Sequence, residues 1–312
     1  HEAGAGHIRV FGGGGGVIVP SEIAALHAYG VTRIYSPEDG QRMGLPGMIQ
    51  DMVEHCGFDP ATLSPVRLDA LGDRDWLNLA RIITSLENDA LSEIERKRLA
   101  GDSERPVPVL GITGTGGAGK SSLTDELIRR FRFDYEDELT VVVLAIDPTR
   151  RRTGGALLGD RIRMNAIDGE RVFMRSLATR GGSSEVPEYL PEVINAAKLA
   201  GADLVIVETP GIGQGDAGIV PYVDRSLYVM TPEFGAASQL EKIDMLDYAD
   251  VIAINKFDRR GAEDALRDVA KQVQRNREVF DRSPEEMPVY GSVAAHFNDD
   301  GVTAVYQALL DI

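Results

Sequence analysis

The stretch GITGTGGAGKSS, residues 111–122, decides what kind of fold this chain can form. Within it, residues 114–121 match the pattern GxxxxGK[ST] at every fixed position. An apolar run at residues 109–113 precedes the pattern, and a helical pattern at residues 121–131 follows it. Glycines between a strand and a helix let backbone N–H groups turn toward a phosphate at the positive end of the helix. The stretch therefore predicts a phosphate-binding loop in an α/β fold.

The side chains of this loop have separate predicted roles. We expect the Lys120 ammonium to reach the β- and γ-phosphates of a nucleotide and the Ser121 hydroxyl to bind Mg²⁺. A chance glycine turn beside a lysine is the alternative, and the strand–loop–helix context argues against it. The predicted nucleotide contacts in this loop are Gly117, Ala118, Gly119, Lys120, Ser121 and Ser122.

Composition limits the partners of the chain. Its 312 residues carry a formal net charge of −16, which weighs against binding to nucleic acid because phosphate backbones are bound through basic patches. No apolar run approaches the ~20 residues of a membrane helix, so we expect no membrane partner. A single cysteine, Cys56, fits a reducing, cytoplasmic compartment. The chain starts without Met and ends directly after a helical pattern, so we expect a piece of a longer protein.

Short apolar runs alternate with helical patterns from Val107 onward. The runs are VPVLGIT, TVVVLAID, DLVIVET, RSLYVM, DVIAIN and MPVYGSV. Because they are short, rich in β-branched residues and apolar on both faces, they predict the buried strands of a doubly wound, mostly parallel sheet. We therefore expect residues 106–312 to form a P-loop domain that binds its ligand at the carboxyl ends of the strands.

The rest of the chain divides into two regions. Residues 59–105 are charged and helical in pattern, and we expect them to form a helical linker. Residues 1–58 read as strand, glycine turn, helix, strand, loop and helix, which is an α/β half-domain without its first elements.

The identity of the base follows from AINKFD, where Asn255, Lys256 and Asp258 form an NKxD pattern directly after a predicted strand. A carboxylate at Asp258 accepts hydrogen bonds from N1–H and the exocyclic amine of guanine, whereas N1 of adenine is itself an acceptor. Asn255 either binds N7 or braces the phosphate loop, and the Lys256 stem covers the base. The pattern favours GTP and GDP over adenine nucleotides.

Acidic residues at two further strand ends are candidate metal ligands. Asp147 ends one apolar run, and Glu208 ends another just before Thr209-Pro210-Gly211. Carboxylates at the ends of strands that flank a phosphate loop are suited to holding Mg²⁺, directly or through water. A helix cap or a solvated turn is the alternative for both. The Gly211 amide can sense the γ-phosphate, which would make residues 209–218 a switch.

A loop and a helical pattern over RRRTGGALLGDRIRM carry two more candidates. Asp160 can position Mg²⁺ or water, and Arg163 can neutralise charge in the transition state, in the manner of an arginine finger supplied in cis. An Asp and an Arg at this spacing also suit a surface ion pair, and spacing alone leaves the two interpretations open.

Glu208-Thr-Pro-Gly, AIDPTRRRTGGALLGDRIRM and NKFD together resemble the metallochaperone-type GTPases, and among them the G-protein chaperones of cobalamin-dependent acyl-CoA mutases. The resemblance covers residues 75–312. It implies that Arg163 contacts the nucleotide and that Asn255, Lys256 and Asp258 read the base. It implies Mg²⁺ and hydrolysis positions at Ser121, Asp147, Asp160, Glu208 and Thr209, and a catalytic set of Lys120, Asp160, Arg163 and Glu208.

The N-terminal stretch GGGGGVIVPSEIAALHAYGVTRIYSPEDG is similar to the last third of the Rossmann-like cobalamin-binding domain of those mutases. Gly15 and Gly16 match the glycine pair that lets the nucleotide tail of the cofactor approach the backbone. The upstream Asp-x-His-x-x-Gly motif, which supplies the cobalt-ligating histidine, is absent, and neither His1 nor His7 fits it.

A cobalamin domain followed by a GTPase is the order found in the fused isobutyryl-CoA mutases. The resemblance implies a Mg²⁺-dependent GTPase that gates adenosylcobalamin loading or repair for a mutase substrate domain of the same longer chain, which converts isobutyryl-CoA, an acyl-CoA, to n-butyryl-CoA. We also expect a homodimer. The alternatives are a stand-alone mutase chaperone, a nickel-delivery GTPase and an ATP-dependent small-molecule kinase.

Overall fold

The computed structural model describes residues 6–13, 18–58, 66–72, 74–101, 106–147, 164–179, 186–211, 216–234 and 240–310. The chain forms two compact units, His1–Val66 and Arg67–Ile312. Within the described residues, each unit has its own sheet, with two strands in the first and seven in the second.

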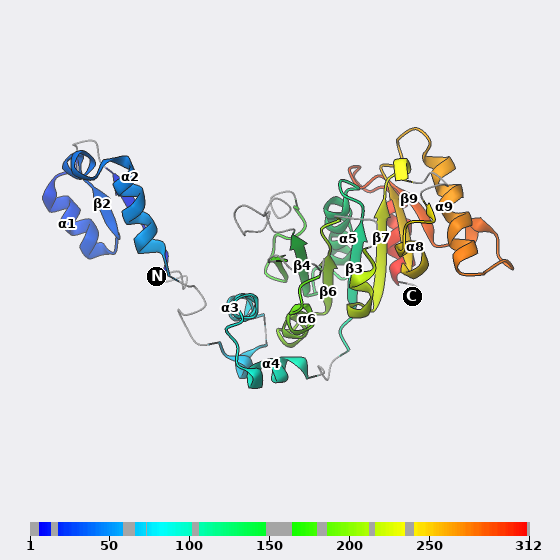
Figure 1. The fold of residues 1–312 in the computed structure, drawn as a ribbon, viewed down its shortest axis with the longest axis horizontal. Coiled ribbons are helices and arrows are strands. Elements are labelled where there is room, and N and C mark those ends of the chain that lie inside the picture. Colours follow the sequence, from blue (N-terminus) through cyan, green and yellow to red (C-terminus); the bar gives the residue numbers. More distant parts are fainter. Residues whose placement is uncertain are drawn as a thin grey trace. The chain divides into compact units, whose positions relative to one another are not determined.

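The second unit is built on a parallel sheet of order β5-β4-β6-β3-β7-β8-β9 (Figure 1). Along the chain, its strands are β3 (Val109–Gly114), β4 (Val141–Asp147), β5 (Val172–Ala178), β6 (Leu204–Glu208), β7 (Arg225–Met230), β8 (Val251–Asn255) and β9 (Val289–Ser292). Every residue of β3, β4, β6 and β8 is buried, because helices cover both faces of a parallel sheet. The predicted doubly wound α/β fold is confirmed.

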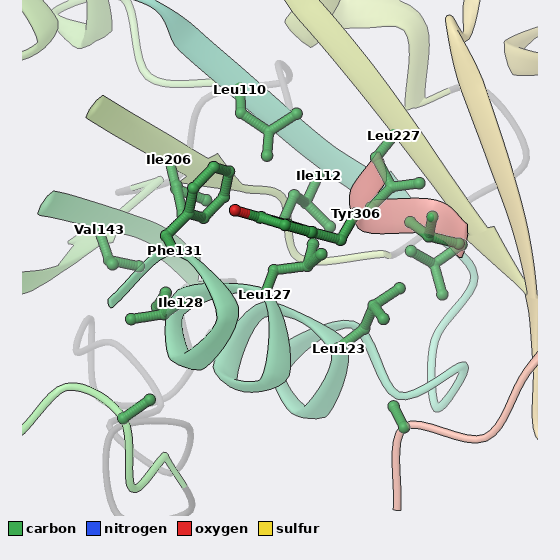
Figure 2. Close-up of a cluster of buried hydrophobic side chains, with 14 of the residues drawn as sticks. Leu110, Ile112, Leu123, Leu127, Ile128, Phe131, Val143, Ile206, Leu227 and Tyr306 are labelled. Carbon is green, nitrogen blue, oxygen red and sulfur yellow. The ribbon is translucent and has the colours of Figure 1, made fainter. Parts of the chain in front are cut away.

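One face of the sheet is covered by α5 (Lys120–Asp134) and α10 (Asp300–Leu310). Apolar residues spaced three and four apart along α5 point from the helix toward the strands, and Tyr306 of α10 packs edge-on against Phe131 with ring centroids 5.0 Å apart. Figure 2 shows part of this cluster, with labels on Leu110, Ile112, Leu123, Leu127, Ile128, Phe131, Val143, Ile206, Leu227 and Tyr306. This packing fixes α5, and with it the glycine-rich loop, against the end of β3.

The other face is covered by α6 (Leu190–Leu199), α8 (Met245–Tyr248) and α9 (Ala262–Asn276). Alternate residues of β7 and β8 turn to this side, where Tyr228, Met230, Ile252 and Ile254 pack against the helices. Short 3₁₀ turns complete the unit at η2 (Leu68–Ala70), η4 (Asp216–Tyr222), η5 (Pro232–Phe234) and η6 (Pro284–Glu286).

Strand β5 was not among the six expected strands, so the sequence-based list was incomplete. It pairs with β4 in register from Val141↔Val172 to Asp147↔Ala178 and forms one edge of the sheet. Its burial is interrupted, and Arg175 lies at its centre. A strand at an edge has a partly exposed face, and the apolar runs of the central strands are not required there.

Helices α3 (Trp76–Glu87) and α4 (Glu93–Ala100) lie in the segment expected to be a linker, and both pack on α6. Trp76 stacks on Phe173 of β5 with ring centroids 5.3 Å apart and donates from Nε1 to the Glu170 carbonyl at 2.9 Å. Glu87, whose side chain is 6% exposed, forms an ion pair with Arg175 at 2.7 Å. These contacts attach α3 to the edge of the seven-stranded sheet.

The first unit is a parallel β–α–β pair followed by a helix. Its elements are β1 (Phe11–Gly13), α1 (Pro20–Tyr29), β2 (Arg33–Tyr35) and α2 (Pro37–Cys56). The prediction of a loop after the second strand is wrong, because α2 begins two residues after β2 ends. Ser36 caps α2 by accepting a hydrogen bond from the Asp39 amide at 3.1 Å. The helix kinks at Gly44, where φ is 62°.

The helices of the first unit bury little of their apolar surface. Neither α1 nor α2 contains a buried residue among those described, and Tyr29, Leu45 and Val53 are each more than half exposed. In the described parts of both units, no helix combines the length and the hydropathy that a membrane crossing requires.

Candidate functional site

The glycine-rich loop lies at the carboxyl end of β3 and leads directly into α5. Gly119, the residue before the helix, has a φ of 91°, a backbone conformation that favours glycine. A Cβ at Gly119 would lie 2.5 Å from Nδ2 of Asn255. The loop therefore depends on glycine both for its backbone conformation and for the close approach of a side chain from β8.

Lys120 is the first residue of α5, and only 7% of it is exposed. Its Nζ donates to the carbonyl oxygens of Gly114 at 3.0 Å and Thr115 at 3.3 Å. A Cβ at Gly211, where φ is 67°, would clash with Nζ and with the Gly114 carbonyl. The turn after β6 thus touches the glycine-rich loop, and the ammonium lies between them.

Glu208, at the end of β6, connects that strand to α5. Its Oε1 accepts a hydrogen bond from Ser121 Oγ at 2.7 Å, and its Oε2 accepts one from Thr124 Oγ1 at 2.9 Å. Glu208 is 5% exposed and Thr124 is fully buried. The structure brings together Ser121 and Glu208, two of the predicted metal ligands.

Sequence reasoning missed Thr124. The sequence feature that could have pointed to Thr124 is its hydroxyl one helical turn after Ser121, in the run GKSSLT. Spacing on a helix could place the two hydroxyls on one face, but nothing in the sequence indicated that Glu208 packs against that face.

Two other predicted ligands, Asp147 and Thr209, lie at or directly after the ends of neighbouring strands. Asp147 ends β4 and is 4% exposed, and β4 pairs with β6 so that Ala145 lies opposite Glu208. Thr209 is 2% exposed and donates from Oγ1 to the Thr113 hydroxyl at 2.8 Å. The Thr209 hydroxyl is therefore engaged between the strands β3 and β6.

The NKFD residues lie at the end of β8, beside the glycine-rich loop. Asn255 donates from Nδ2 to the Ala118 carbonyl at 2.7 Å and accepts at Oδ1 from the Ala294 amide at 3.0 Å. Lys256, with a φ of 60°, donates from Nζ to the Gly117 carbonyl at 2.7 Å. Asp258 is exposed. Asn255 thus braces the loop, which was one of the two roles considered for it.

An ion pair connects the loop after NKFD to the segment that follows β7. Arg259 forms an ion pair with Glu233 at 2.5 Å. A hydrogen bond from the Thr231 side chain and the neighbouring Arg259 guanidinium lower the pKa of the Glu233 carboxyl to about 2. Glu233 is therefore a carboxylate at neutral pH, and the ion pair holds the two loops together.

Residues 166–168 are hydrogen-bonded to side chains of α5. The Ala166 amide donates to Asp125 Oδ1 at 2.6 Å, and the Ala166 carbonyl accepts from Arg132 Nη1 at 2.7 Å. Arg132 also donates to the Asp168 carbonyl at 2.7 Å. The helix that begins in the phosphate loop therefore also holds residues 166–168.

Some predicted positions lie outside the described residues: Asp160, Arg163, Gly15, Gly16 and residues 212–215 of the expected switch. Ser122 is described and is exposed on the first turn of α5. Among the described residues, no group of three or more His, Cys, Asp or Glu side chains is arranged to hold a metal ion.

Comparison with known proteins agrees with this arrangement of loop, strand ends and NKFD. The family model of the methylmalonyl-CoA mutase-associated GTPase MeaB matches residues 79–311. The chain belongs to this family. Membership in the MeaB family makes the chain a GTPase, and the resemblance expected from the sequence motifs is confirmed.

Relatives of this MeaB-family chain include longer proteins. The fused isobutyryl-CoA mutase of Cupriavidus metallidurans is 66% identical over 310 residues, covering 99% of this chain and 28% of that protein. The fused isobutyryl-CoA mutase of Nocardia farcinica is 64% identical over 312 residues, covering 100% of this chain and 29% of that protein. The chain thus spans less than a third of the length of these relatives.

A solved structure, that of a LAO/AO transport system kinase, shares the fold of this MeaB-family chain. Its TM-score is 0.54 at 24% identity, with 81% of this chain and 76% of that chain covered. At this identity, the likeness concerns the fold alone.

Proposed function

We propose that residues 106–312 form a Mg²⁺-dependent GTPase module that controls cofactor loading in a larger mutase. The observation that carries the proposal is the 2.7 Å hydrogen bond between Ser121 Oγ and Glu208 Oε1, which joins the phosphate-loop hydroxyl to a strand-end carboxylate. Hydroxyl and carboxylate oxygens beside a phosphate loop are the ligands that Mg²⁺ prefers.

The donor set fits a hard divalent cation. Ser121, Asp147 and Glu208 offer oxygen atoms only and lie on α5, β4 and β6, with Asp147 and Glu208 buried at neighbouring strand ends. We assign Asp160 and Thr209 to the same set on the family resemblance. When bound, Mg²⁺ would neutralise negative charge on the β- and γ-phosphate oxygens.

We expect the loop to orient the phosphates of the nucleotide. Lys120 would exchange its bonds to the Gly114 and Thr115 carbonyls for the β- and γ-phosphates, and the backbone of residues 117–122 would supply N–H donors. Glu208 would orient an attacking water through its carboxylate, and Arg163 would stabilise transition-state charge. Lys120→Ala removes the ammonium and should abolish tight nucleotide binding, whereas wild-type affinity in that variant would contradict the phosphate-loop assignment.

GTP is proposed as the nucleotide, with Asp258 accepting from guanine and Asn255 and Lys256 bracing the loop beneath it. The competing function is an ATP-dependent small-molecule kinase, which has no need for NKFD. Affinity for fluorescent GDP and ADP analogues, measured on the same protein with Mg²⁺, separates the two functions. Equal or tighter binding of ADP would overturn the choice of guanine.

The domain assignment is part of the proposal: residues 1–58 as the C-terminal part of a cobalamin-binding domain, 59–105 as a linker and 106–312 as the GTPase. In the full-length protein, Gly15 and Gly16 would line the path of the adenosylcobalamin tail. GTP hydrolysis would then gate loading or repair of this cofactor in a substrate domain that isomerises isobutyryl-CoA to n-butyryl-CoA, in a cytoplasmic homodimer.

Cofactor transfer in the full-length protein tests the proposal that GTP hydrolysis gates cofactor loading. Apo-protein is mixed with adenosylcobalamin in the presence of GTP, GDP or a non-hydrolysable GTP analogue, and the visible spectrum of the cofactor reports its binding. We expect the loading rate to differ between GTP and its analogue. Identical loading under all three conditions would contradict gating while leaving GTP hydrolysis untouched.

A further inference from the structure

We propose that Thr124 is a positioning residue that holds the Glu208 carboxylate in register with the phosphate loop. The inference rests on the proposed function, because it concerns how Glu208 does its work. Thr124 lies outside the GxxxxGK[ST] pattern, one helical turn beyond Ser121.

The Thr124 side chain is enclosed and faces two acceptors. It is fully buried, with Oγ1 2.9 Å from Glu208 Oε2 and 3.0 Å from the Lys120 carbonyl oxygen. A hydroxyl has a single hydrogen to donate. The Lys120 carbonyl is already the backbone acceptor of the helical turn, and a carboxylate forms the stronger, charge-assisted bond. The hydrogen therefore goes to Glu208.

The two carboxylate oxygens of Glu208 are divided between two hydroxyls of α5. Oε1 accepts from Ser121 and Oε2 from Thr124. Two bonds from one rigid helix fix both the position and the rotation of the carboxylate plane. Because α5 starts in the phosphate loop, this plane is fixed relative to the nucleotide site as well.

The two hydroxyls differ in what else they would do. Ser121 is a proposed metal ligand, so its oxygen has a second task. Thr124 is not a proposed ligand, and its bond to Glu208 is available whether or not Ser121 binds the metal. Hydrogen-bonding partners of ligating carboxylates orient those ligands, and their removal typically costs about 10–100-fold in metal affinity or activity.

A purely structural role would give a different result. Thr side chains in helices often bond the carbonyl four residues before them, which affects the stability and curvature of the helix itself. Such a role predicts a change in stability only. A positioning role predicts lower turnover or weaker Mg²⁺ affinity, and any hydroxyl at position 124 should restore the lost function.

The test compares Thr124→Val, which keeps the shape, with Thr124→Ser, which keeps the hydroxyl. Thr303→Val on α10 is the control, because Thr303 also bonds the carbonyl four residues before it, that of Asp299 at 3.1 Å, and its other hydrogen bond, from Arg130 Nη2 at 3.2 Å, does not involve Glu208. Measured for each variant are kcat and KM for GTP, the Mg²⁺ concentration at half-maximal rate, and GDP affinity in EDTA.

For Thr124→Val we expect kcat to fall, or the half-saturating Mg²⁺ concentration to rise, by about 10–100-fold. Metal-free GDP affinity should stay within about twofold of wild type, because the loop contacts to the phosphates and base are intact. Thr124→Ser should restore most of the loss, and Thr303→Val should match wild type. If Thr124→Val does not fold, the comparison of Thr124→Ala with Thr124→Ser serves the same purpose.

Glu208→Gln separates failure of this inference from failure of the proposed function. If Glu208→Gln impairs turnover while Thr124→Val does not, the positioning role is wrong and the proposed function stands. If Glu208→Gln is also neutral, the proposed role of Glu208 is overturned, and the inference with it. A Thr124→Val loss that Thr124→Ser does not restore would likewise overturn the hydroxyl as its cause.

Discussion

Asn255 donates a hydrogen bond from Nδ2 to the carbonyl oxygen of Ala118 at 2.7 Å, and so joins the end of β8 to the loop before α5. Its Oδ1 accepts from the Ala294 amide at 3.0 Å, which adds the loop after β9. One buried side chain therefore links three loops that are far apart in the sequence.

Replacing Asn255 with alanine should weaken both the fold and nucleotide binding. The change leaves the buried Ala118 carbonyl and Ala294 amide without this partner, which should lower the free energy of unfolding by about 1–3 kcal/mol. GDP affinity should fall at least about tenfold, the equivalent of about 1.4 kcal/mol. Urea unfolding and fluorescent GDP titration measure the two effects. Asn276→Ala, at an exposed position, is the control, and an equal response in both variants would contradict the bracing role.

Gly119 and Gly117 should respond differently to alanine. Both have positive φ, 91° and 74°, so each alanine should cost roughly 1–2 kcal/mol of backbone strain. A Cβ at Gly117 meets nothing within 4 Å, whereas at Gly119 it would lie 2.5 Å from Asn255 Nδ2. We expect Gly119→Ala to lower the free energy of unfolding more than Gly117→Ala, as measured by urea unfolding. Equal losses would show that Asn255 moves aside freely.

Asp258→Asn should shift base selectivity from guanine toward xanthine. The exposed carboxylate is the proposed acceptor for guanine, and an amide can donate to the xanthine oxygen instead. We expect the ratio of GDP to XDP affinity to fall at least about tenfold, measured by competition with a fluorescent nucleotide. Asp264→Asn, an exposed change on α9, should leave the ratio unaltered. An unchanged ratio in Asp258→Asn would exclude the base-reading role.

Two arginines near β5 allow a test of how α3 is attached. Arg175 pairs with Glu87, whose side chain is 6% exposed, whereas Arg171 pairs with Glu138, whose side chain is 76% exposed. Arg175→Met leaves a buried carboxylate without this partner and should cost about 1–3 kcal/mol of unfolding free energy. Arg171→Met should cost less than about 1 kcal/mol. Denaturant unfolding measures both, and the reverse order would contradict a stabilising role for the Glu87 pair.

The central strands were predictable because each is a run of buried apolar residues. Buried along their whole length are β3, β4, β6 and β8. Helices cover both faces of the sheet, so each of these strands needs apolar residues at successive positions. β5 escaped prediction because it lies at the edge and carries Arg175 among its apolar residues. The segment after β2, expected to be a loop, is helical because Ser36 and Asp39 form a capping box that outweighs the Pro and Gly residues after it.

The sequence by itself determined the chemistry of the local motifs. A glycine loop between strand and helix can be recognised from residues 114–121, since its residue types occur at a fixed spacing in one short stretch. The NKxD pattern is recognised in the same way. Both motifs are identified by residue types within a few positions of one another.

Only the tertiary structure decided which side chains support the loop. Thr124 meets Glu208 across 84 residues, Asn255 meets Ala118 across 137, and Lys256 meets Gly117 across 139. The order of strands in the sheet brings these pairs together, because parallel neighbours place their carboxyl ends at one edge whatever their separation in sequence. No local periodicity encodes that order, so the partner of each side chain is fixed by the fold.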